Sequence, residues 1–461
     1  MTQLVIPSEP IVVNPPQGMS QLPMVEIDRS NVLSKRKHIR FRRGSSNRQS
    51  AECSFGNFDA ENLEFSAWEF FHAAKKTELA SSFTGVQAIR NTYAFAFEHQ
   101  DTFIWNTNNF RKIDNSNFEL EDFASAALAG RVGEAIAYLT MIKWGYVFWD
   151  RCQTVWGRAA VNANIIHPES LRSTQFLPSR VAPGRPQNEP DFIFEKGDGS
   201  VALMEAKGSF VNPIEDKPST KEDLRQALKQ LAAWSTVITP TPEKSYGIGT
   251  YLREENDSGS DPSLIAYVDP PGQDDPNAGA IELPPDLIRR LNYAAWLAGM
   301  GLVSASQALG GMKERAAHYV DLPILEVGGR SFAFVNAGWS VPEKHLPKPE
   351  SWMRWAYALH FWDLGLHPSQ PDWRIWRHIQ HSLDWVPLII GIERTVLKLI
   401  ESALRYPTRP VLKEFSGFEL GRTQSGEGSN KWSLMPDGTF IGLLDSRTFE
   451  EGFKGMETFQ L

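Results

Sequence analysis

The sequence has few cysteines and no long apolar run. Only Cys53 and Cys152 occur in 461 residues, too few for a disulfide framework or a cysteine-rich zinc site, so we expect a reducing, cytoplasmic compartment. No stretch approaches the roughly 18 uninterrupted apolar residues of a membrane span, so we expect no membrane association through such a segment. The N-terminus has no basic start followed by an apolar core, which argues against a secretory signal. No Walker motif is present, so we expect no ATPase activity.

Basic residues are outnumbered by acidic ones over the whole chain, but not in one segment. The net charge is −8, which excludes a protein coated in basic surface but not a local basic groove. Residues 29–48, the basic segment, hold eight Lys and Arg and no acid. Such a segment either neutralises nucleic-acid phosphates or is a solvated tail that binds nothing. Its candidate nucleic-acid contacts are Lys35, Arg36, Lys37, Arg40, Arg42 and Arg43.

Composition and periodicity divide the chain into four regions. Residues 1–50 are rich in Pro, Ser and Arg and are predicted to form a basic, extended arm, followed by a helical region at 51–115. Residues 116–270 are predicted to form an α/β domain. After a polar linker at 270–280, residues 281–461 are predicted to form a mainly helical, Trp-rich C-terminal domain. Within it, "PILEVGGRSFAFV" predicts a hairpin, because Gly-Gly suits a two-residue turn.

The α/β domain shows a regular order of elements between residues 121 and 269. A helix with a buried face, "EDFASAALAGRVGEAIAYLTMIKWGY", is followed by the short strand "YVFWD" and a long polar insertion at 153–189. A hairpin, "PDFIFEKGDGSVALMEAKGS", comes next. The amphipathic helix "KEDLRQALKQLAAWSTVI" and the strands "KSYGIGTYLR" and "SLIAYVDP" complete the order: helix, three strands, helix, two strands.

The hairpin carries three charged residues at its open end. If Glu195 or Lys196 pairs with Val201, constant index sums across the hairpin put Asp191 opposite Glu205 or the residue after it. Directly opposed Cβ atoms lie about 5 Å apart. Lys207 shares a strand face with Glu205, because side chains alternate along a strand. The sequence therefore places two carboxylates and one ammonium group together.

Two adjacent carboxylates repel each other, and a hard divalent cation with oxygen ligands is the usual remedy. An ammonium group beside them can hold a water molecule or hydroxide ion and stabilise developing negative charge. Hydrolysis of a phosphodiester uses these parts, because metal-bound water attacks and the metal stabilises the charged transition state. The pattern favours a site for Mg²⁺ or Mn²⁺.

These residues resemble the PD-(D/E)XK nuclease superfamily, which has the restriction-endonuclease-like fold. The match is Pro190-Asp191, thirteen residues, and then Glu205-Ala206-Lys207. The resemblance implies an α/β core with mainly helical flanking regions. It also implies that Asp191, Glu205 and the Ala206 carbonyl bind metal and that Lys207 serves the nucleophile. A second triplet, Glu215-Asp216-Lys217, has no strand around it and is a decoy.

Two more residues are candidates for the site. Many members of the superfamily carry an acid on the helix before the sheet, and here Glu134 lies beside the apolar stripe of that helix, where it could bind metal or pair with Arg131 as a surface residue. The later helix resembles the "QxxxY" element, with Gln230 in the motif but Trp234 in place of Tyr. A plain amphipathic helix accounts for that segment equally well.

The leading interpretation is a Mg²⁺-dependent endonuclease that hydrolyses DNA in restriction, phage defence or repair. One alternative is a catalytically silent, nuclease-like subunit that binds DNA or takes part in assembly, and another is an RNA-directed nuclease. The basic segment is predicted to contribute nucleic-acid affinity rather than chemistry. The C-terminal domain is a candidate surface for a protein partner, and the sequence leaves oligomerisation open.

Overall fold

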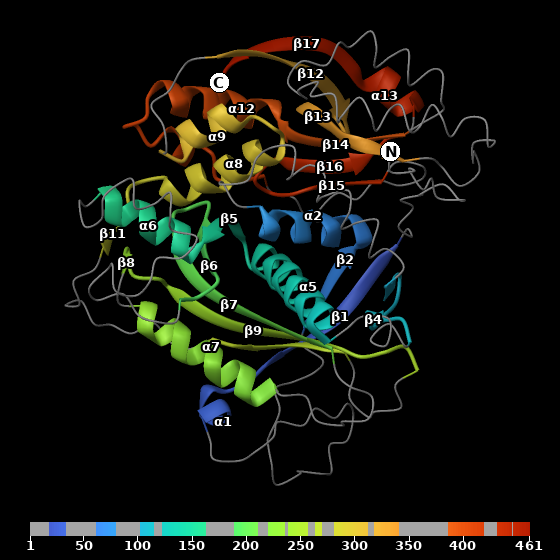
Figure 1. Ribbon diagram of the computed structural model, residues 1–461, viewed down its shortest axis with the longest axis vertical. Coiled ribbons are helices and arrows are strands. Elements are labelled where there is room, and N and C mark those ends of the chain that lie inside the picture. The colour runs from blue at the N-terminus through green and yellow to red at the C-terminus, as the bar shows by residue number, and fades with distance from the viewer. Residues whose placement is uncertain are drawn as a thin grey trace, which may run out of the picture.

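Figure 1 shows the computed structural model of the chain, in which two sheets are separated by helices. The structure describes residues 18–33, 61–79, 102–114, 122–162, 189–210, 220–235, 238–256, 263–269, 281–311, 318–340, 386–418, 431–444 and 446–461. Within these ranges, no helix is long and apolar enough to cross a membrane.

The larger sheet is mixed and has seven strands in the order β2-β1-β10-β9-β7-β6-β5. β1 pairs with β10 and β7 pairs with β9 in parallel, and the other neighbours are antiparallel. The strands are β1 (Met19–Glu26), β2 (Glu61–Ser66), β5 (Tyr146–Arg151), β6 (Phe192–Lys196), β7 (Val201–Phe210), β9 (Lys244–Leu252) and β10 (Leu264–Val268).

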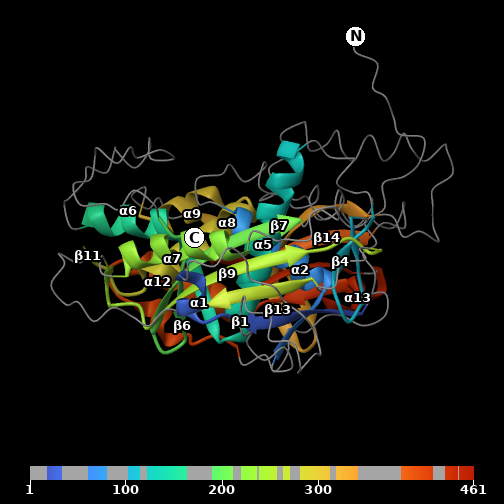
Figure 2. The same cartoon turned by 90° about the horizontal axis from the view of Figure 1, so that it is seen from below.

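Helices cover both faces of this sheet. α5 (Asp122–Lys143) lies on one face. α7 (Thr220–Trp234) connects the parallel strands β7 and β9 and crosses the other face, as Figure 2 shows from below. α5 approaches β7 closely because glycines meet there. A Cβ on Gly208 would lie 1.8 Å from the Ala129 carbonyl oxygen, and one on Gly133 would lie 2.7 Å from the Gly208 Cα.

These contacts assign the two faces of β7. The Cβ position of Gly208 is on the α5 side of the strand. Because side chains alternate, the side chain of Ala206, two residues earlier, is on the same side. Glu205 pairs with Gly247, whose Cβ position contacts Ala227 and Leu231 of α7. Glu205 therefore faces α7, and so does the residue two places on, Lys207.

The smaller sheet has six antiparallel strands in the order β15-β16-β14-β13-β12-β17. Its strands are β12 (Tyr319–Val327), β13 (Arg330–Ser340), β14 (Val386–Glu393), β15 (Lys431–Leu434), β16 (Thr439–Leu443) and β17 (Phe453–Gln460). The helices of this half are α8 (Leu287–Gly299), α9 (Val303–Leu309), α12 (Arg394–Arg405), the 3-10 helix η5 (Val411–Glu414) and α13 (Ser446–Gly452).

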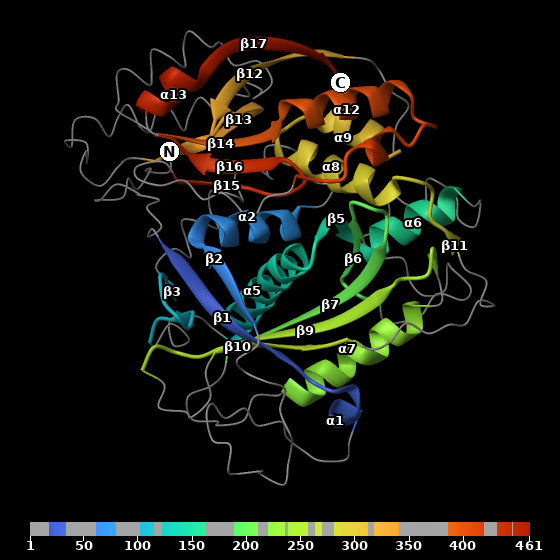
Figure 3. The ribbon, with the colours of Figure 1, turned by 180° about the vertical axis from the view of Figure 1, so that it is seen from behind.

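α2 (Ala67–Glu78) joins the two halves. It packs on α5 below and on β15 and β16 above, as seen from behind in Figure 3. Residues 67–77 are all buried, including the charged ones. A capping box begins the helix, in which the Ser66 hydroxyl accepts from the Glu69 N–H and the Glu69 carboxylate accepts from the Ser66 N–H.

Short elements complete the description. They are α1 (Arg29–Leu33), β3 (Phe103–Ile104), β4 (Arg111–Lys112), α6 (Cys152–Asn162), β8 (Ile238–Thr239) and β11 (Ile281–Glu282). α6 follows β5 directly and buries Val155, Trp156 and Ala159. Part of the predicted polar insertion at 153–189 is therefore a helix, because small and apolar residues recur at helical spacing there.

The mixed α/β character is confirmed, and the predicted elements of residues 121–269 occur in the predicted sequence, with α6 and the short strand β8 as elements that were not predicted. α5 ends before Gly145, which has a φ of +86° that suits glycine. The hairpin β6–β7, the helix α7 and the strands β9 and β10 follow in the predicted order, and β12–β13 turns at Gly328-Gly329 as predicted.

Three expectations differ from the structure. Residues 19–26, assigned to an extended arm, form β1 within the larger sheet, because alternate side chains are buried against it. The region at 51–115, predicted to be helical, contains β2, β3 and β4 as well as α2. Within its described residues the C-terminal region is not mainly helical, because the six-stranded sheet is built entirely from residues 319–460, and the Trp-rich segment at 352–385 lies outside the described ranges.

Candidate active site

The β6–β7 hairpin brings Asp191 and Glu205 together. Glu195 pairs with Val201 and Phe192 with Met204, so the index sum puts Asp191 opposite Glu205, one of the two predicted registers. The Asp191 N–H donates to the Glu205 Oε2 over 3.0 Å, and the Ala206 N–H donates to the Asp191 Oδ2 over 3.0 Å. Each carboxylate is thus held by the backbone of the opposite strand.

The Ala206 carbonyl group lies at the same end of the hairpin as Asp191 and Glu205. The N–H and C=O of one residue in a strand point to the same side. Because the Ala206 N–H points to Asp191, its carbonyl also points to that side of β7. The regular pairing of β6 with β7 stops at Phe192 and Met204, so this carbonyl lies beyond the last paired residues.

Lys207 and Gln230 lie on the α7 face beside Glu205. The Lys207 Nζ donates to the Glu205 Oε1 over 2.5 Å and approaches the Gln230 Oε1 at 3.5 Å. Gln230 is held in turn, because its Nε2 donates to the Glu189 carbonyl over 3.0 Å. The Glu205 side chain is 1% exposed and that of Lys207 is 24% exposed, so the ammonium group is the more accessible of the two.

Burial is the largest influence on the pKa values of both carboxylates. Burial, and then the charge of Asp191, raise the pKa of Glu205 to about 7, and Lys207 only partly offsets them. Burial likewise raises the pKa of Asp191, against the Ala206 hydrogen bond and the charges of Lys207 and Arg151. Both groups therefore resist ionisation, which is the situation that a nearby cation relieves.

Glu134 lies on the other side of the sheet, on α5. Its Oε2 accepts from the Arg151 Nη2 over 2.9 Å. Burial raises the pKa of Glu134 to about 6, Arg151 opposes the rise, and the Asp191 charge adds to it. Glu134 is thus near enough to Asp191 for their charges to interact. The alternative partner, Arg131, is paired with Glu78.

The donor set fits a hard divalent cation through two carboxylates and one backbone carbonyl, from Asp191, Glu205 and Ala206. Among the described residues, no three His, Cys, Asp or Glu side chains form a metal-binding group. Glu134 is therefore a neighbour of this set, and its role as a metal ligand stays a prediction.

Other predicted residues lie outside the described ranges. These are the basic candidates Lys35, Arg36, Lys37, Arg40, Arg42 and Arg43, and the decoy triplet at 215–217. Sequence reasoning missed Arg151, the last residue of β5. The only feature in the sequence that could have identified it is a single basic residue at the end of an apolar strand. Many strands without a functional site also end in a charged, solvent-exposed residue.

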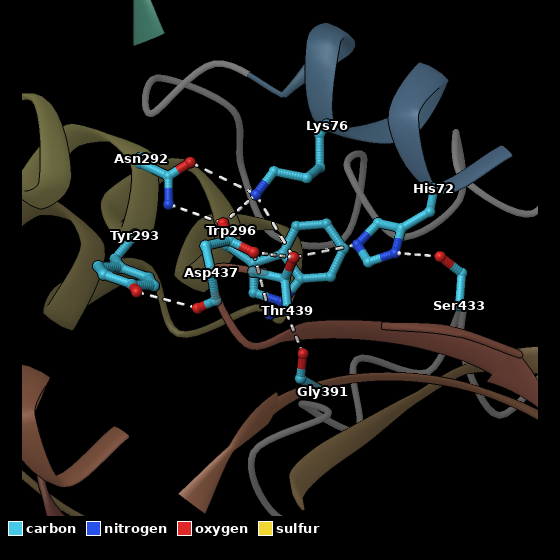
Figure 4. A network of polar contacts seen from close by, with 9 residues as sticks. All are labelled: His72, Lys76, Asn292, Tyr293, Trp296, Gly391, Ser433, Asp437 and Thr439. Atoms are coloured by element: carbon cyan, nitrogen blue, oxygen red, sulfur yellow. Dashed lines mark hydrogen bonds and ion pairs between the residues drawn. The ribbon is translucent and has the colours of Figure 1, made fainter. Parts of the chain in front are cut away.

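A second polar cluster, missed from the sequence, lies where α2 meets the smaller sheet (Figure 4). We call it the junction network, and it comprises His72, Lys76, Asn292, Tyr293, Ser433, Asp437 and Thr439. The Lys76 ammonium group pairs with the Asp437 carboxylate at 2% and 0% side-chain exposure. Asn292 and Thr439 donate to the same carboxylate over 2.9 and 2.7 Å.

The junction network satisfies its own charges. Burial alone would raise the pKa of Asp437, but the Lys76 charge and the hydrogen bonds outweigh it, so that pKa lies below its usual range. Burial lowers the pKa of Lys76, and Asp437 opposes the change. Both His72 ring nitrogens have hydroxyl partners, Ser433 at 3.0 Å and Thr439 at 3.1 Å.

Comparisons of the chain with protein families, with curated proteins and with solved structures find no match.

Proposed function

We propose that the chain is a metal-dependent nuclease that hydrolyses phosphodiester bonds in DNA, with a restriction-endonuclease-like core formed by α5, β5–β7, α7, β9 and β10. One observation carries the proposal: Asp191, Glu205 and Lys207 meet at the open end of one hairpin, with the carboxylates held by each other's backbone. A purely structural cluster gains nothing from an Asp191 charge that raises the pKa of the buried Glu205 carboxylate beside it.

Asp191, Glu205 and the Ala206 carbonyl would hold the metal ion. When bound, Mg²⁺ supplies an activated water molecule and stabilises the charge that develops on the phosphate. The chain's own groups do the rest. Lys207 is anchored by Glu205 and lies next to Gln230, so its ammonium group can hold the attacking water and stabilise negative charge beside it.

The geometry limits what Gln230 can do. Its amide nitrogen is committed to the Glu189 carbonyl, which turns its oxygen toward Lys207. Gln230 therefore positions the ammonium group from the α7 side. Glu189 directly precedes the Pro190-Asp191 pair, so the same hydrogen bond also fixes the entry of the chain into β6.

The test is cleavage of supercoiled, linear and single-stranded DNA, and of RNA, with Mg²⁺, Mn²⁺, Ca²⁺ or chelator. We expect cleavage with Mg²⁺ or Mn²⁺ and binding without efficient cleavage with Ca²⁺, because its looser coordination positions water poorly. Glu205→Gln and Lys207→Ala should each lower the rate by about 100-fold or more.

The decoy triplet offers matched controls, since Glu215→Gln and Lys217→Ala make the same chemical changes ten residues further along the chain. Both should cleave like wild type. Wild-type cleavage by Glu205→Gln would end the proposal. Binding without cleavage under every condition would support the silent subunit, and cleavage of RNA alone would support the RNA-directed enzyme.

A further inference from the structure

Arg151 adjoins the candidate active site at the end of β5. The N–H of the next residue, Cys152, donates to the Asp191 carbonyl over 3.1 Å, which ties the two chain segments together. Arg151 pairs with Phe192 across the sheet, one residue from Asp191. Its charge acts on both Asp191 and Glu134. Its position is therefore fixed relative to the carboxylates.

One side of the guanidinium group is anchored. The Nη2 donates to the Glu134 Oε2 over 2.9 Å and to the Thr77 carbonyl, in the last turn of α2, over 2.8 Å. The guanidinium carbon lies 4.9 Å from the centre of the Phe192 ring. These contacts hold the group on three sides without using its other nitrogens.

The other two nitrogens of the group are not used by these contacts. A guanidinium group has five N–H donors, and Nη2 carries two of them. Within the described ranges, the Nε and Nη1 of Arg151 make no hydrogen bond, and the side chain is 34% exposed. The three N–H groups on these two nitrogens match two oxygens of a phosphate, which arginine binds through a fork of parallel hydrogen bonds.

The charge balance of the site points to the same ligand. When ionised, Glu134, Asp191 and Glu205 carry one more charge than Lys207 and Arg151 together. A bound divalent cation turns this excess into one positive charge, which complements a singly charged phosphodiester. Arg151 would thus supply one of the positive charges that attract that group.

We infer that Arg151 binds the phosphodiester at the site of cleavage through Nε and Nη1, while Nη2 keeps Glu134 and α2 in place. The inference rests on the proposed nuclease function and deepens it. A merely structural arginine would hold Glu134 and Thr77 but would not contribute to the binding of nucleic acid.

The experiment compares Arg151→Gln and Arg151→Lys with wild type. A DNA duplex is bound with Ca²⁺ at a series of salt concentrations, and cleavage with Mg²⁺ gives kcat and KM. Arg394→Gln is the matched control, because Arg394 also pairs with a carboxylate, Glu457, at 43% exposure, but in the C-terminal half.

Removal of one cation that neutralises a phosphate should reduce the slope of log affinity against log salt by about 0.9 in Arg151→Gln. Arg151→Lys keeps the charge and should restore the slope, but without the fork kcat/KM should stay about 10-fold below wild type. Arg394→Gln should match wild type. If Arg151→Gln fails to fold, Arg151→Lys decides, because wild-type kcat/KM in that variant overturns the inference.

An unchanged salt slope in folded Arg151→Gln also overturns it. The proposed function fails separately, namely when wild type neither binds nor cleaves nucleic acid. In that case the affinity of each variant for inorganic pyrophosphate is measured in the presence of Ca²⁺. Equal affinities of wild type and Arg151→Lys would then contradict phosphate binding through the paired N–H groups of Arg151.

Discussion

The candidate active site and the junction network use the same residue types with opposite outcomes. Each contains a Lys and an Asp, which is buried in the junction network and partly buried in the candidate site. In the junction network, the pKa of Asp437 is held below its usual range because Lys76, Asn292 and Thr439 stabilise the ion. In the candidate site, the pKa of Asp191 is raised because burial outweighs its partners. A satisfied cluster is typical of a structural role, and a raised pKa beside a second carboxylate is typical of a functional site, which is the role we propose for Asp191 and Glu205.

α2 links the two clusters. Lys76 belongs to the junction network, and the carbonyl of the next residue, Thr77, accepts from Arg151 beside the candidate site. α5 makes a parallel connection, since Tyr138, one helical turn after Glu134, lies under the Lys76 ammonium group at 5.8 Å from the ring centre. The docking of α2 on the smaller sheet therefore supports the geometry around Arg151 and Glu134.

The two clusters should differ most in how strongly the loss of their Asp charge lowers the free energy of unfolding. Asp437→Ala leaves the Lys76 ammonium group buried without its counter-ion, so we expect the free energy of unfolding to fall by about 3–5 kcal/mol. Asp191→Asn, which keeps an acceptor for the Ala206 N–H, should not destabilise the metal-free protein. Urea unfolding in chelator measures both.

The double variant Lys76→Met/Asp437→Ala provides the control. It should lose less stability than the sum of the single variants, because no buried charge is left unpaired. Additive losses, or an Asp437→Ala protein as stable as wild type, would show that the junction network is not a satisfied ion pair.

The next effect concerns pH. The pKa of Glu205 is raised to about 7 in the folded chain, above the value of about 4.3 for an unfolded glutamate. The stability contributed by protonated Glu205 is fully present below the unfolded pKa and is lost as pH rises through 7. In chelator, Glu205→Gln should therefore become more stable than wild type by about 1–3 kcal/mol above pH 7, and the difference should vanish near pH 4.

Glu69 is the matched control, because burial raises its pKa to about 7 as well, within the capping box of α2. Glu69→Gln should show a pH effect of the same sign. Added Mg²⁺ should raise the melting temperature of wild type and Glu69→Gln above pH 7 but not that of Glu205→Gln. An equal response of all three proteins to Mg²⁺ would remove the distinction between a site and a buried acid.

Local sequence information was enough for the hairpin and its charged end. The index sum across β6–β7 limited Asp191 to two partners, and the structure has one of them, Glu205. The element order around the hairpin followed from periodicity in the same way. Glu134 was identified from the resemblance to the nuclease superfamily, many members of which carry an acid on the helix before the sheet, and its position beside the apolar stripe supported the choice.

Contacts between residues far apart in the sequence could not be predicted from periodicity or local spacing. Lys76 and Asp437 are 361 residues apart, and nothing near either one indicates the other. β1 was missed for a similar reason, because its parallel partner β10 pairs Met24 with Ile265. Apart from the predicted β12–β13 hairpin, the smaller sheet was missed, because short apolar runs such as β14 and β16 fit a buried helix as well as a strand.

The smallest predicted effect concerns where nucleic acid is first attracted. The acids and bases of the candidate site nearly cancel, and the whole chain has a net charge of −8, so long-range attraction must come from a local excess of positive charge. The basic segment supplies one. Replacing Lys35, Arg36, Lys37, Arg40, Arg42 and Arg43 by Gln should lower the salt slope of DNA binding by about 0.9 for each phosphate that is no longer neutralised, and should leave kcat unchanged. Substitution is preferable to deletion of residues 1–48, because deletion also removes β1 from the larger sheet.

The control variant replaces Lys398, Arg405, Lys413 and Lys454, in the C-terminal half, by Gln. It should leave the salt slope of DNA binding as in wild type. A slope that responds only to the control set would place the attraction on the C-terminal half, and one that responds to neither would leave the loaded site itself as its source.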